Sequence, residues 1–320
     1  MKKTGGTEVA KILITEKVQE IGPKMLTDAG HEIVYADRDM DVIKREIVDA
    51  DAVFVRIIDL TPELLSTAKN LKMVSKHGVG LDNIPVEWCK EHGIVVTMTP
   101  NANSQSVAEH AFALMMTLAK NVIPVSNAYK EIGFAAKNSK EGVEVTGKTV
   151  GIVGLGNIGK RFAKMCYGGF DMKVLAYDPY VKEAPEGVTL VEDLDSMLRE
   201  ADIVSLHAML TDETRKMMNA ERIGQMKPTA ILINCARGPI VDEPALIDAL
   251  ENGRLAAAGL DVTDPEPVDP ESKLFKMKNV IVTPHYAPTT LESAMRVSEI
   301  GCSNILACLD GKGEMVGRVA

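Results

Sequence analysis

Three polar side chains follow three successive predicted β-strands in the C-terminal half of the sequence. They are Arg237, Glu266 and His285, and the predicted strands before them are Ala230–Asn234, Ala257–Val262 and Val280–Thr283. In an open sheet of parallel strands, ligands bind beyond the carboxyl ends of the strands. We therefore expect one basic, one acidic and one imidazole side chain to converge on a single site.

This set of side chains fits the exchange of a proton and a hydride at the C2 carbon of a small 2-hydroxy or 2-oxo acid. Histidine is the natural proton carrier near neutral pH, and the Glu266 carboxylate can fix the tautomer of His285. Arg237 can bind the substrate carboxylate and polarise the C2 carbonyl. Each residue also has an ordinary structural explanation: a surface histidine, an ion-pair partner, and a solvated loop carboxylate between Pro265 and Pro267.

A GxGxxG motif lies where a hydride-carrying cofactor could be held. The motif is Gly154-Leu155-Gly156-Asn157-Ile158-Gly159, directly after the predicted strand Thr149–Val153 and at the start of a predicted helix. Its glycines allow a tight turn, a close approach of the backbone to a pyrophosphate, and close packing of helix against strand. The amino end of the helix adds free amides and a positive dipole end. The motif in this context predicts a bound dinucleotide.

The expected partner of the nucleotide ribose is Asp178, nineteen residues after Gly159 at the end of the predicted strand Lys173–Tyr177. A carboxylate there accepts hydrogen bonds from ribose hydroxyls and repels a 2′-phosphate, which favours NAD over NADP. Lys182 nearby leaves NADP as an alternative. A glycine-rich turn followed by an acid also suits S-adenosylmethionine, so a methyltransferase is a second alternative.

Strands and helices alternate through most of the chain, which predicts parallel sheets with helices on their faces. Further strands are expected at Lys11–Thr15, Glu32–Tyr35, Ala52–Ile57, Leu71–Ser75, Ile94–Thr97 and Ile203–Leu206, and helices at Glu16–Ala29 and Val42–Val48. The predicted fold is α/β, with two doubly wound, Rossmann-like domains and a cleft between them.

Two capping boxes are expected to begin long helices, Ser106 with Glu109 and Thr289 with Glu292. The second helix, which runs to about Leu309, is long enough to return to the first domain. We therefore predict a discontinuous substrate-binding domain at 1–103 and 291–320, and an NAD-binding domain at 104–290.

Composition excludes several classes of function. The 320 residues have a formal net charge of −9 and a pI near 5.3, which disfavours nucleic acid as a partner. No segment approaches the roughly 18 apolar residues of a membrane span, and the basic start Met1-Lys2-Lys3 is not followed by a signal-peptide core. The five cysteines show no CxxC spacing, so we expect reduced thiols, no metal site and a cytoplasmic location.

Several stretches together resemble the D-isomer-specific 2-hydroxyacid dehydrogenases, a family that includes phosphoglycerate dehydrogenases and hydroxypyruvate reductases. The resemblance covers nearly the whole chain and is to the short form, without the regulatory domain of longer phosphoglycerate dehydrogenases. The matching stretches are His77–Ile84, Ser106–His110, Gly154–Gly159, Asn234–Gly238, Gly259–Val262 and Thr283–His285.

The resemblance implies roles for individual residues. Arg237 would bind and polarise the substrate, His285 would be the acid/base and Glu266 its partner. Amides around Val79 and Gly80 would bind the substrate carboxylate. The resemblance places the following residues against NAD: Asn157, Ile158, Asp178, Cys235, Ala236 and Asp261. It also implies a dimer built on the cofactor domains.

The substrate is less well defined by the sequence. In phosphoglycerate dehydrogenases, basic residues at places similar to Arg56 and Lys76 bind the substrate phosphate, which favours 3-phosphoglycerate or glycerate/hydroxypyruvate over lactate-type acids. The sequence departs from many members of the family by lacking a tryptophan in Tyr129–Val145 and by the bulkier Tyr286-Ala287-Pro288 after His285. A non-catalytic, NAD-sensing protein similar to the corepressors of this family remains an alternative. Cys235 is expected to be a packing residue and not a nucleophile.

Overall fold

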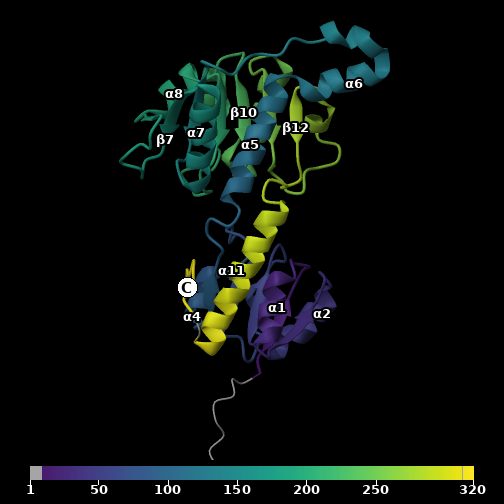
Figure 1. Cartoon of the computed structure of the whole chain (residues 1–320), viewed down its shortest axis with the longest axis vertical. Helices are drawn as coiled ribbons and strands as arrows, with labels where there is room; N and C mark the ends of the chain where they lie inside the picture. Colours follow the sequence, from purple (N-terminus) through teal and green to yellow (C-terminus); the bar gives the residue numbers. More distant parts are fainter. Residues whose placement is uncertain (1–8, 312) are drawn as a thin grey trace, which may run out of the picture. The chain divides into compact units, whose positions relative to one another are not determined.

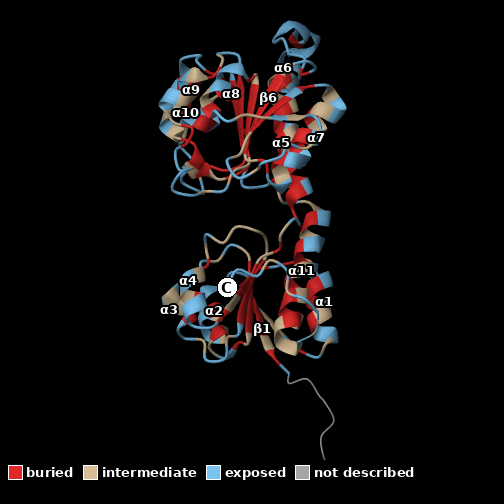
Figure 2. Cartoon of the chain, turned by 90° about the vertical axis from the view of Figure 1, so that its left-hand side faces the viewer, coloured by how far each residue is buried: buried red, intermediate tan, exposed pale blue. Residues whose placement is uncertain are grey.

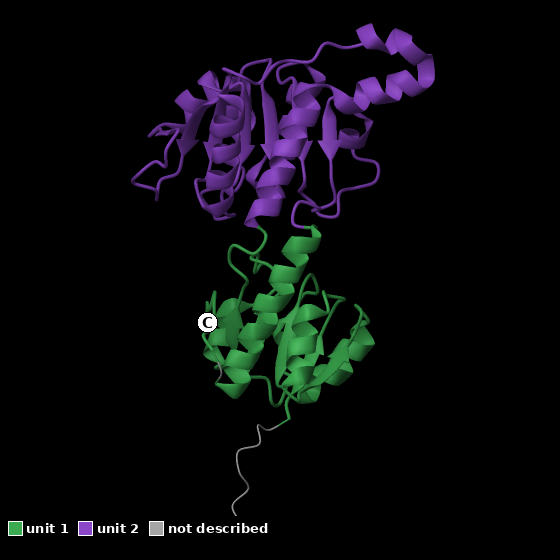
Figure 3. Ribbon diagram, viewed as in Figure 1, with its two compact units in different colours: residues 1–103, 289–320 green, residues 104–288 purple. Residues whose placement is uncertain are grey.

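The computed structural model describes residues 9–311 and 313–320, so Met1-Lys2-Lys3 lie outside the described part. The chain divides into two compact units (Figure 3). Unit 1 comprises Met1–Asn103 and Thr289–Ala320, and unit 2 comprises Ser104–Pro288. From the sequence, we expected the chain to return to unit 1 at residue 291, two residues after the observed boundary. Each unit is a parallel sheet covered by helices, so the predicted fold class is confirmed.

Unit 1 has a five-stranded sheet in the order β2-β1-β3-β4-β5. The strands are β1 Lys11–Ile14, β2 Glu32–Tyr35, β3 Ala52–Val55, β4 Met73–Lys76 and β5 Val95–Thr97. Helices α1 (Ile21–Asp28) and α11 (Leu291–Asp310) pack together on one face. Helices α2 (Met40–Glu46), α3 (Pro62–Leu65) and α4 (Val86–Glu91) cover the other (Figure 2). The strand order reverses between β1 and β3, where α/β sheets bind ligands.

Unit 2 has a seven-stranded parallel sheet in the order β12-β11-β10-β9-β6-β7-β8 (Figure 1). The strands are β6 Thr149–Val153, β7 Lys173–Tyr177, β8 Val188–Leu190, β9 Ile203–Leu206, β10 Ile231–Asn234, β11 Ala257–Leu260 and β12 Val280–Val282. Helices α5 (Ser104–Ala119) and α7 (Asn157–Phe170) lie on one face, and α8 (Leu194–Glu200), α9 (Ala220–Gln225) and α10 (Glu243–Glu251) lie on the other. Here the order reverses between β6 and β9.

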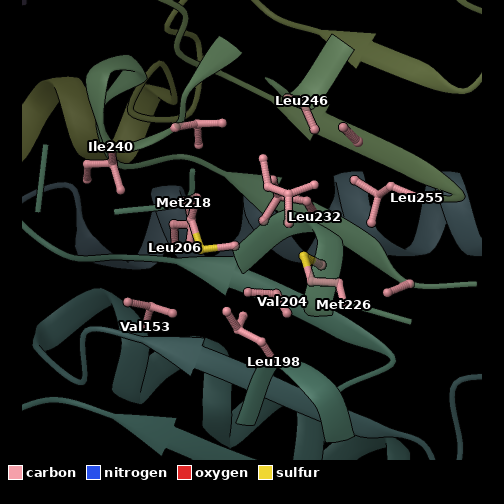
Figure 4. Packing of buried hydrophobic residues seen from close by; sticks show 14 of the residues in the cluster. Val153, Leu198, Val204, Leu206, Met218, Met226, Leu232, Ile240, Leu246 and Leu255 are labelled. Atoms are coloured by element: carbon pink, nitrogen blue, oxygen red, sulfur yellow. The ribbon is translucent and has the colours of Figure 1, made fainter. Parts of the chain in front are cut away.

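The cores of both units are mainly aliphatic, in keeping with an aromatic content of only 4%. Because helices cover both faces of each sheet, central strands such as β3, β6 and β10 are buried along their whole length. Figure 4 shows the result in unit 2, where leucine, isoleucine, valine and methionine side chains fill the space between the sheet and α8–α10.

Four helix starts differ from the sequence expectation. Helix α2 begins at Met40 and not at Val42, and the Asp39 side chain caps it. Helix α1 begins at Ile21 and not at Glu16, whose side chain bonds backbone amides of another loop. Helix α5 begins at Ser104, so Ser106 and Glu109 lie inside it and form no capping box. The cap of α11 is Thr290, whose side chain accepts a hydrogen bond from Ser293 N–H, and not Thr289.

Two regular elements were missed by the sequence reading. One is the short strand β8; the other is helix α6 (Val122–Ile132), which continues into the 3-10 helix η2 (Gly133–Asn138). None of the residues of α6 is buried, and the helix projects away from the sheet of its own unit (Figures 1 and 2). The other 3-10 helices are η1 Ile47–Asp49, η3 Gly238–Ile240 and η4 Lys273–Lys276. Among the described helices, none combines the length and apolar character that a membrane crossing needs.

Candidate active site

His285 and Glu266 form a hydrogen-bonded pair in unit 2. The His285 Nδ1 lies 2.7 Å from Glu266 Oε1, and 43% and 42% of the two side chains are exposed. His285 sits just beyond β12 and has φ +52°, while Glu266 lies in the loop after β11. The structure thus brings together two of the three residues that sequence reasoning selected, and leaves the imidazole accessible to a ligand.

Asp261 fixes the turn that carries His285. Its carboxylate is 1% exposed and accepts hydrogen bonds from the Thr283 hydroxyl (2.5 Å) and from the N–H groups of Tyr286 (2.7 Å) and Ala287 (2.9 Å). Its backbone carbonyl accepts a hydrogen bond from the His285 N–H (2.8 Å). The resemblance had assigned Asp261 to the cofactor, and sequence reasoning missed this second task. Its position at the end of β11, beside the end of β12, was the available signal.

His110 joins the same cluster from α5. Its Nε2 lies 3.0 Å from the Thr283 hydroxyl and 3.4 Å from Asp261 Oδ1. The ring meets Tyr286 edge to face, at 6.1 Å between centroids. The sequence identified His110 only as part of a matching stretch. In the structure, the His110 side chain contacts the same Thr283 hydroxyl that donates to Asp261.

Arg237 occupies the turn after β10, and the side-chain amide of Asn234 holds that turn by two hydrogen bonds. Asn234 Oδ1 accepts from the Ala236 N–H, and its Nδ2 donates to the Arg237 carbonyl, both at 3.0 Å. The next residue, Gly238, lies so close to the following loop that a Cβ atom would stand 1.9 Å from the Thr263 carbonyl oxygen. Glycine therefore allows the turn bearing Arg237 to contact the loop that leads to Glu266.

The glycine-rich turn has the shape that a pyrophosphate requires. Gly154 has φ +93°, and a Cβ there would lie 2.6 Å from the Ala208 nitrogen; a Cβ on Gly159 would lie 2.2 Å from the Gly154 carbonyl oxygen. Gly156 faces open space, and no side chain caps α7, which begins at the next residue. Free amides at Asn157 and Ile158 beside an uncovered glycine fit a bound dinucleotide.

Asp178 follows β7 and holds the glycine-rich turn in place. Its Oδ2 accepts a hydrogen bond from the Leu155 N–H (2.8 Å), and Oδ1 accepts one from the Tyr180 N–H (2.9 Å). Each carboxylate oxygen retains a second lone pair, so this geometry is compatible with ribose binding. Lys182 is exposed on the loop that follows. The sequence had suggested only the ribose contact.

Two further groups at these strand ends are uncharged. His207, at the end of β9 beside Gly154, has its pKa lowered to about 3 by burial, and its Nε2 lies 2.9 Å from the Ser205 hydroxyl. Burial, followed by the charge of Asp261, raises the pKa of the Cys235 thiol well above its usual value. Cys235 and its neighbour Ala236 are both buried. A buried thiol of raised pKa is a poor nucleophile, as expected for a packing residue.

The four candidate substrate residues lie at the carboxyl edge of the unit 1 sheet. Arg56 follows β3 and is half-buried, and its guanidinium makes no hydrogen bond or ion pair within the described residues. Within the described residues, the N–H groups of Val79 and Gly80 likewise donate to no acceptor. Lys76 is different: its ammonium bonds the Arg56 carbonyl and Asn83 Oδ1, and these contacts favour a structural role over a contact with the substrate.

Comparisons with known proteins show what this chain is similar to. Residues 112–287 match the family described as D-isomer specific 2-hydroxyacid dehydrogenase, NAD binding domain. The chain is 38% identical, over 95% of its length, to a D-3-phosphoglycerate dehydrogenase of Methanocaldococcus jannaschii, but it spans only 58% of that relative. It is 40% identical to a hydroxypyruvate reductase of Thermotoga maritima, covering 83% of the chain and 87% of the relative.

A solved structure has the same fold along nearly the whole chain. D-lactate dehydrogenase of Aquifex aeolicus, complexed with NAD and lactic acid, is 35% identical and superposes with a TM-score of 0.82, covering 94% of this chain and 96% of that one. The family model covers more than half of the chain and includes the glycine-rich turn, Arg237, Glu266 and His285. The chain therefore belongs to the D-isomer specific 2-hydroxyacid dehydrogenase family.

Proposed function

We propose that the protein is an NAD-dependent oxidoreductase that transfers a hydride between nicotinamide and C2 of a small D-2-hydroxy or 2-oxo acid. The observation that carries the proposal is the 2.7 Å pair of His285 and Glu266, at the carboxyl edge of the sheet whose glycine-rich turn opens α7. Family membership and the names of the relatives support the same reaction.

The proton chemistry follows from the orientation of His285. Because Nδ1 faces Glu266, Nε2 is left to exchange a proton with the C2 oxygen. Within the described residues, Nε2 has no hydrogen-bond partner. The Glu266 carboxylate stabilises the imidazolium that forms when a hydroxyl is oxidised. Arg237 binds the substrate carboxylate and polarises the carbonyl. NAD, when bound, supplies or accepts the hydride.

We further infer that the substrate is 3-phosphoglycerate or glycerate/hydroxypyruvate. The N–H groups of Val79 and Gly80 have no acceptor within residues 9–311 and 313–320, which suits a carboxylate. The Arg56 guanidinium has no partner in the same residues, which suits a second anionic group. Relatives named for both substrates match this chain at similar identity. The free thiols of all five cysteines support a cytoplasmic location.

NADH oxidation on a panel of 2-oxo acids tests the proposed function. The panel contains 3-phosphohydroxypyruvate, hydroxypyruvate, glyoxylate, pyruvate and a longer apolar acid. We expect turnover of the first two, with one of them preferred. If NADH binds tightly but none of the acids is reduced, the oxidoreductase proposal fails and the NAD-sensing alternative replaces it.

Asp178→Ala is expected to reduce the preference for NADH over NADPH. Removing the carboxylate ends the repulsion of a 2′-phosphate and also removes a hydrogen-bond acceptor for the ribose hydroxyls. The ratio of kcat/KM for NADH to that for NADPH should therefore fall about 10–100-fold. Initial rates with both cofactors measure the ratio. Asp193→Ala, which removes an exposed helix-capping carboxylate elsewhere in unit 2, should leave it unchanged. An unaltered ratio in Asp178→Ala would show that this residue does not select the cofactor.

We propose that the protein is a homodimer whose copies meet through α6. Apolar side chains of this helix and of η2 are exposed by 45–76%: Val122, Ile123, Tyr129, Ile132 and Phe134. Val122, Tyr129 and Phe134 border a hollow of ≈ 480 Å³ that Val125 and Ala136 also line. The patch belongs to the unit that the resemblance assigns to dimer contacts. A second copy offers the same apolar patch, so a two-fold contact would bury both.

Phe134→Glu is expected to convert the dimer to a monomer. Phe134 is 76% exposed, and a carboxylate at this position would have to be desolvated in the proposed contact. Sedimentation velocity should give a dimer for the wild type and a monomer for the variant. The control is Phe275→Glu, at an exposed phenylalanine of η4, which should remain dimeric. A monomeric wild type, or a variant that stays dimeric, would contradict the proposed interface.

A further inference from the structure

The loop that follows β3 is held from one side by a buried carboxylate. Glu16, which follows β1, is 2% exposed and accepts hydrogen bonds from three consecutive backbone N–H groups. The N–H of Arg56 lies 2.9 Å from Oε2, and those of Ile57 and Ile58 lie 2.6 and 2.9 Å from Oε1. The Thr15 hydroxyl bonds Oε2 as well. Both oxygens of the carboxylate are thus fully used.

The same loop is held from its carbonyl side by two other side chains. The Lys76 ammonium, on a residue 8% exposed, bonds the Arg56 carbonyl and Asn83 Oδ1. Asn83 Nδ2 donates to the Ile58 carbonyl at 2.7 Å. These contacts reach backbone polar groups of the segment 56–58. The conformation of that segment is therefore fixed by Glu16 after β1, by Lys76 at the end of β4 and by Asn83 after β4.

The position of these contacts in the sheet relates them to substrate binding. Glu16 and Arg56 follow the two neighbouring strands, β1 and β3, between which the strand order reverses. Burying a carboxylate is costly unless its charge is compensated, and here backbone amides provide the compensation. Glu16 therefore fixes the backbone of Arg56 without forming an ion pair with its guanidinium, whose charge remains available to a ligand.

We propose that Glu16 is a positioning residue for substrate recognition: it holds the Arg56–Ile58 loop so that the Arg56 guanidinium can bind a second anionic group of the substrate. This inference rests on the proposed function, in which Arg56 binds that group. It predicts that Glu16 acts through Arg56 and affects only substrates that carry the additional charge. A residue that merely stabilised unit 1 would affect all substrates alike.

A double-mutant cycle of Glu16→Gln and Arg56→Ala tests the coupling. Glutamine keeps the size of the side chain but turns an NH2 group toward at least one backbone N–H. We expect KM for 3-phosphohydroxypyruvate to rise about tenfold in Glu16→Gln, with kcat and the KM for hydroxypyruvate within about twofold of the wild type. In the Arg56→Ala background, Glu16→Gln should produce no further change.

Asp51→Asn is the matched control for stability. Asp51 lies at the amino edge of the same sheet, where its carboxylate accepts from the Lys11 N–H (2.9 Å) and pairs with Lys72 (2.9 Å). Asp51→Asn should lower the melting temperature, but it should not change the KM for 3-phosphohydroxypyruvate more than the KM for hydroxypyruvate. Equal losses on both substrates in Glu16→Gln, or effects that add to those of Arg56→Ala, would overturn the proposal, as would an Arg56→Ala variant with unchanged KM values.

Amide hydrogen exchange provides a readout that needs no turnover. Peptides covering Arg56–Ile58 should exchange at least about tenfold faster in Glu16→Gln than in the wild type or in Asp51→Asn, because the amides lose their acceptor. Unchanged exchange would overturn the positioning role whatever the kinetics. A wild type that reduces no 2-oxo acid would refute the proposed function, and the exchange result would show separately whether Glu16 holds the loop.

Discussion

His285→Ala is expected to lower kcat for the best 2-oxo acid by about 10²–10⁴-fold, the range for loss of a general acid or base. The imidazole Nδ1 is held by Glu266 at 2.7 Å, which leaves Nε2 as the ring nitrogen that can exchange a proton with the substrate. NADH binding should be unchanged, because the glycine-rich turn and Asp178 do not depend on His285. Steady-state rates and fluorescence titration with NADH measure the two quantities.

Two comparisons make this result specific. Glu266→Gln keeps a hydrogen bond to Nδ1 but removes the charge, so its loss of kcat should be smaller than that of His285→Ala. His92→Ala removes an exposed imidazole stacked on Trp88 in unit 1 and should leave kcat unchanged. Turnover of His285→Ala within about threefold of the wild type would exclude His285 as the acid/base.

Asp261→Asn is expected to lower both stability and turnover, although it replaces a single oxygen by an NH2 group. The carboxylate serves the Thr283 hydroxyl and the N–H groups of Tyr286 and Ala287, all of them donors in this arrangement. An asparagine NH2 must face one of them at a site that is 1% exposed. Leaving buried donors unpaired predicts a loss of about 2–4 kcal/mol in the free energy of unfolding.

The same substitution should loosen the turn that aims His285 at the substrate, and kcat should fall by about tenfold or more while NADH still binds. Urea denaturation and steady-state kinetics measure the two effects. Asp212→Asn, at an exposed position of unit 2, should change neither. A free energy of unfolding within about 0.5 kcal/mol of the wild type would show that Asp261 does not hold this loop as the hydrogen bonds indicate.

Local sequence pattern predicted most of the regular structure. Strands β2, β6, β7 and β9 have the bounds expected from their β-branched and apolar runs. The central strands β6 and β9 need such a run because they are buried on both faces. Helix α6 was missed for the opposite reason: its apolar residues contact little of the described chain, and no pattern distinguishes a projecting helix from a connector. The capping residues also differed by one or two positions, since neighbouring serines and threonines are chemically equivalent as caps.

The sequence by itself determined the chemistry that the site can hold: a glycine-rich turn for a dinucleotide, an acid after the second strand, and an arginine, a glutamate and a histidine after successive strands. Those residues are recognisable because each follows a predicted strand within a few residues of its end. Only the tertiary structure showed that Asp261 holds the His285 turn and that Glu16 binds the amides of a loop forty residues away. Such contacts depend on which strands are neighbours in the sheet, and the pattern of a single strand carries no information about its neighbours.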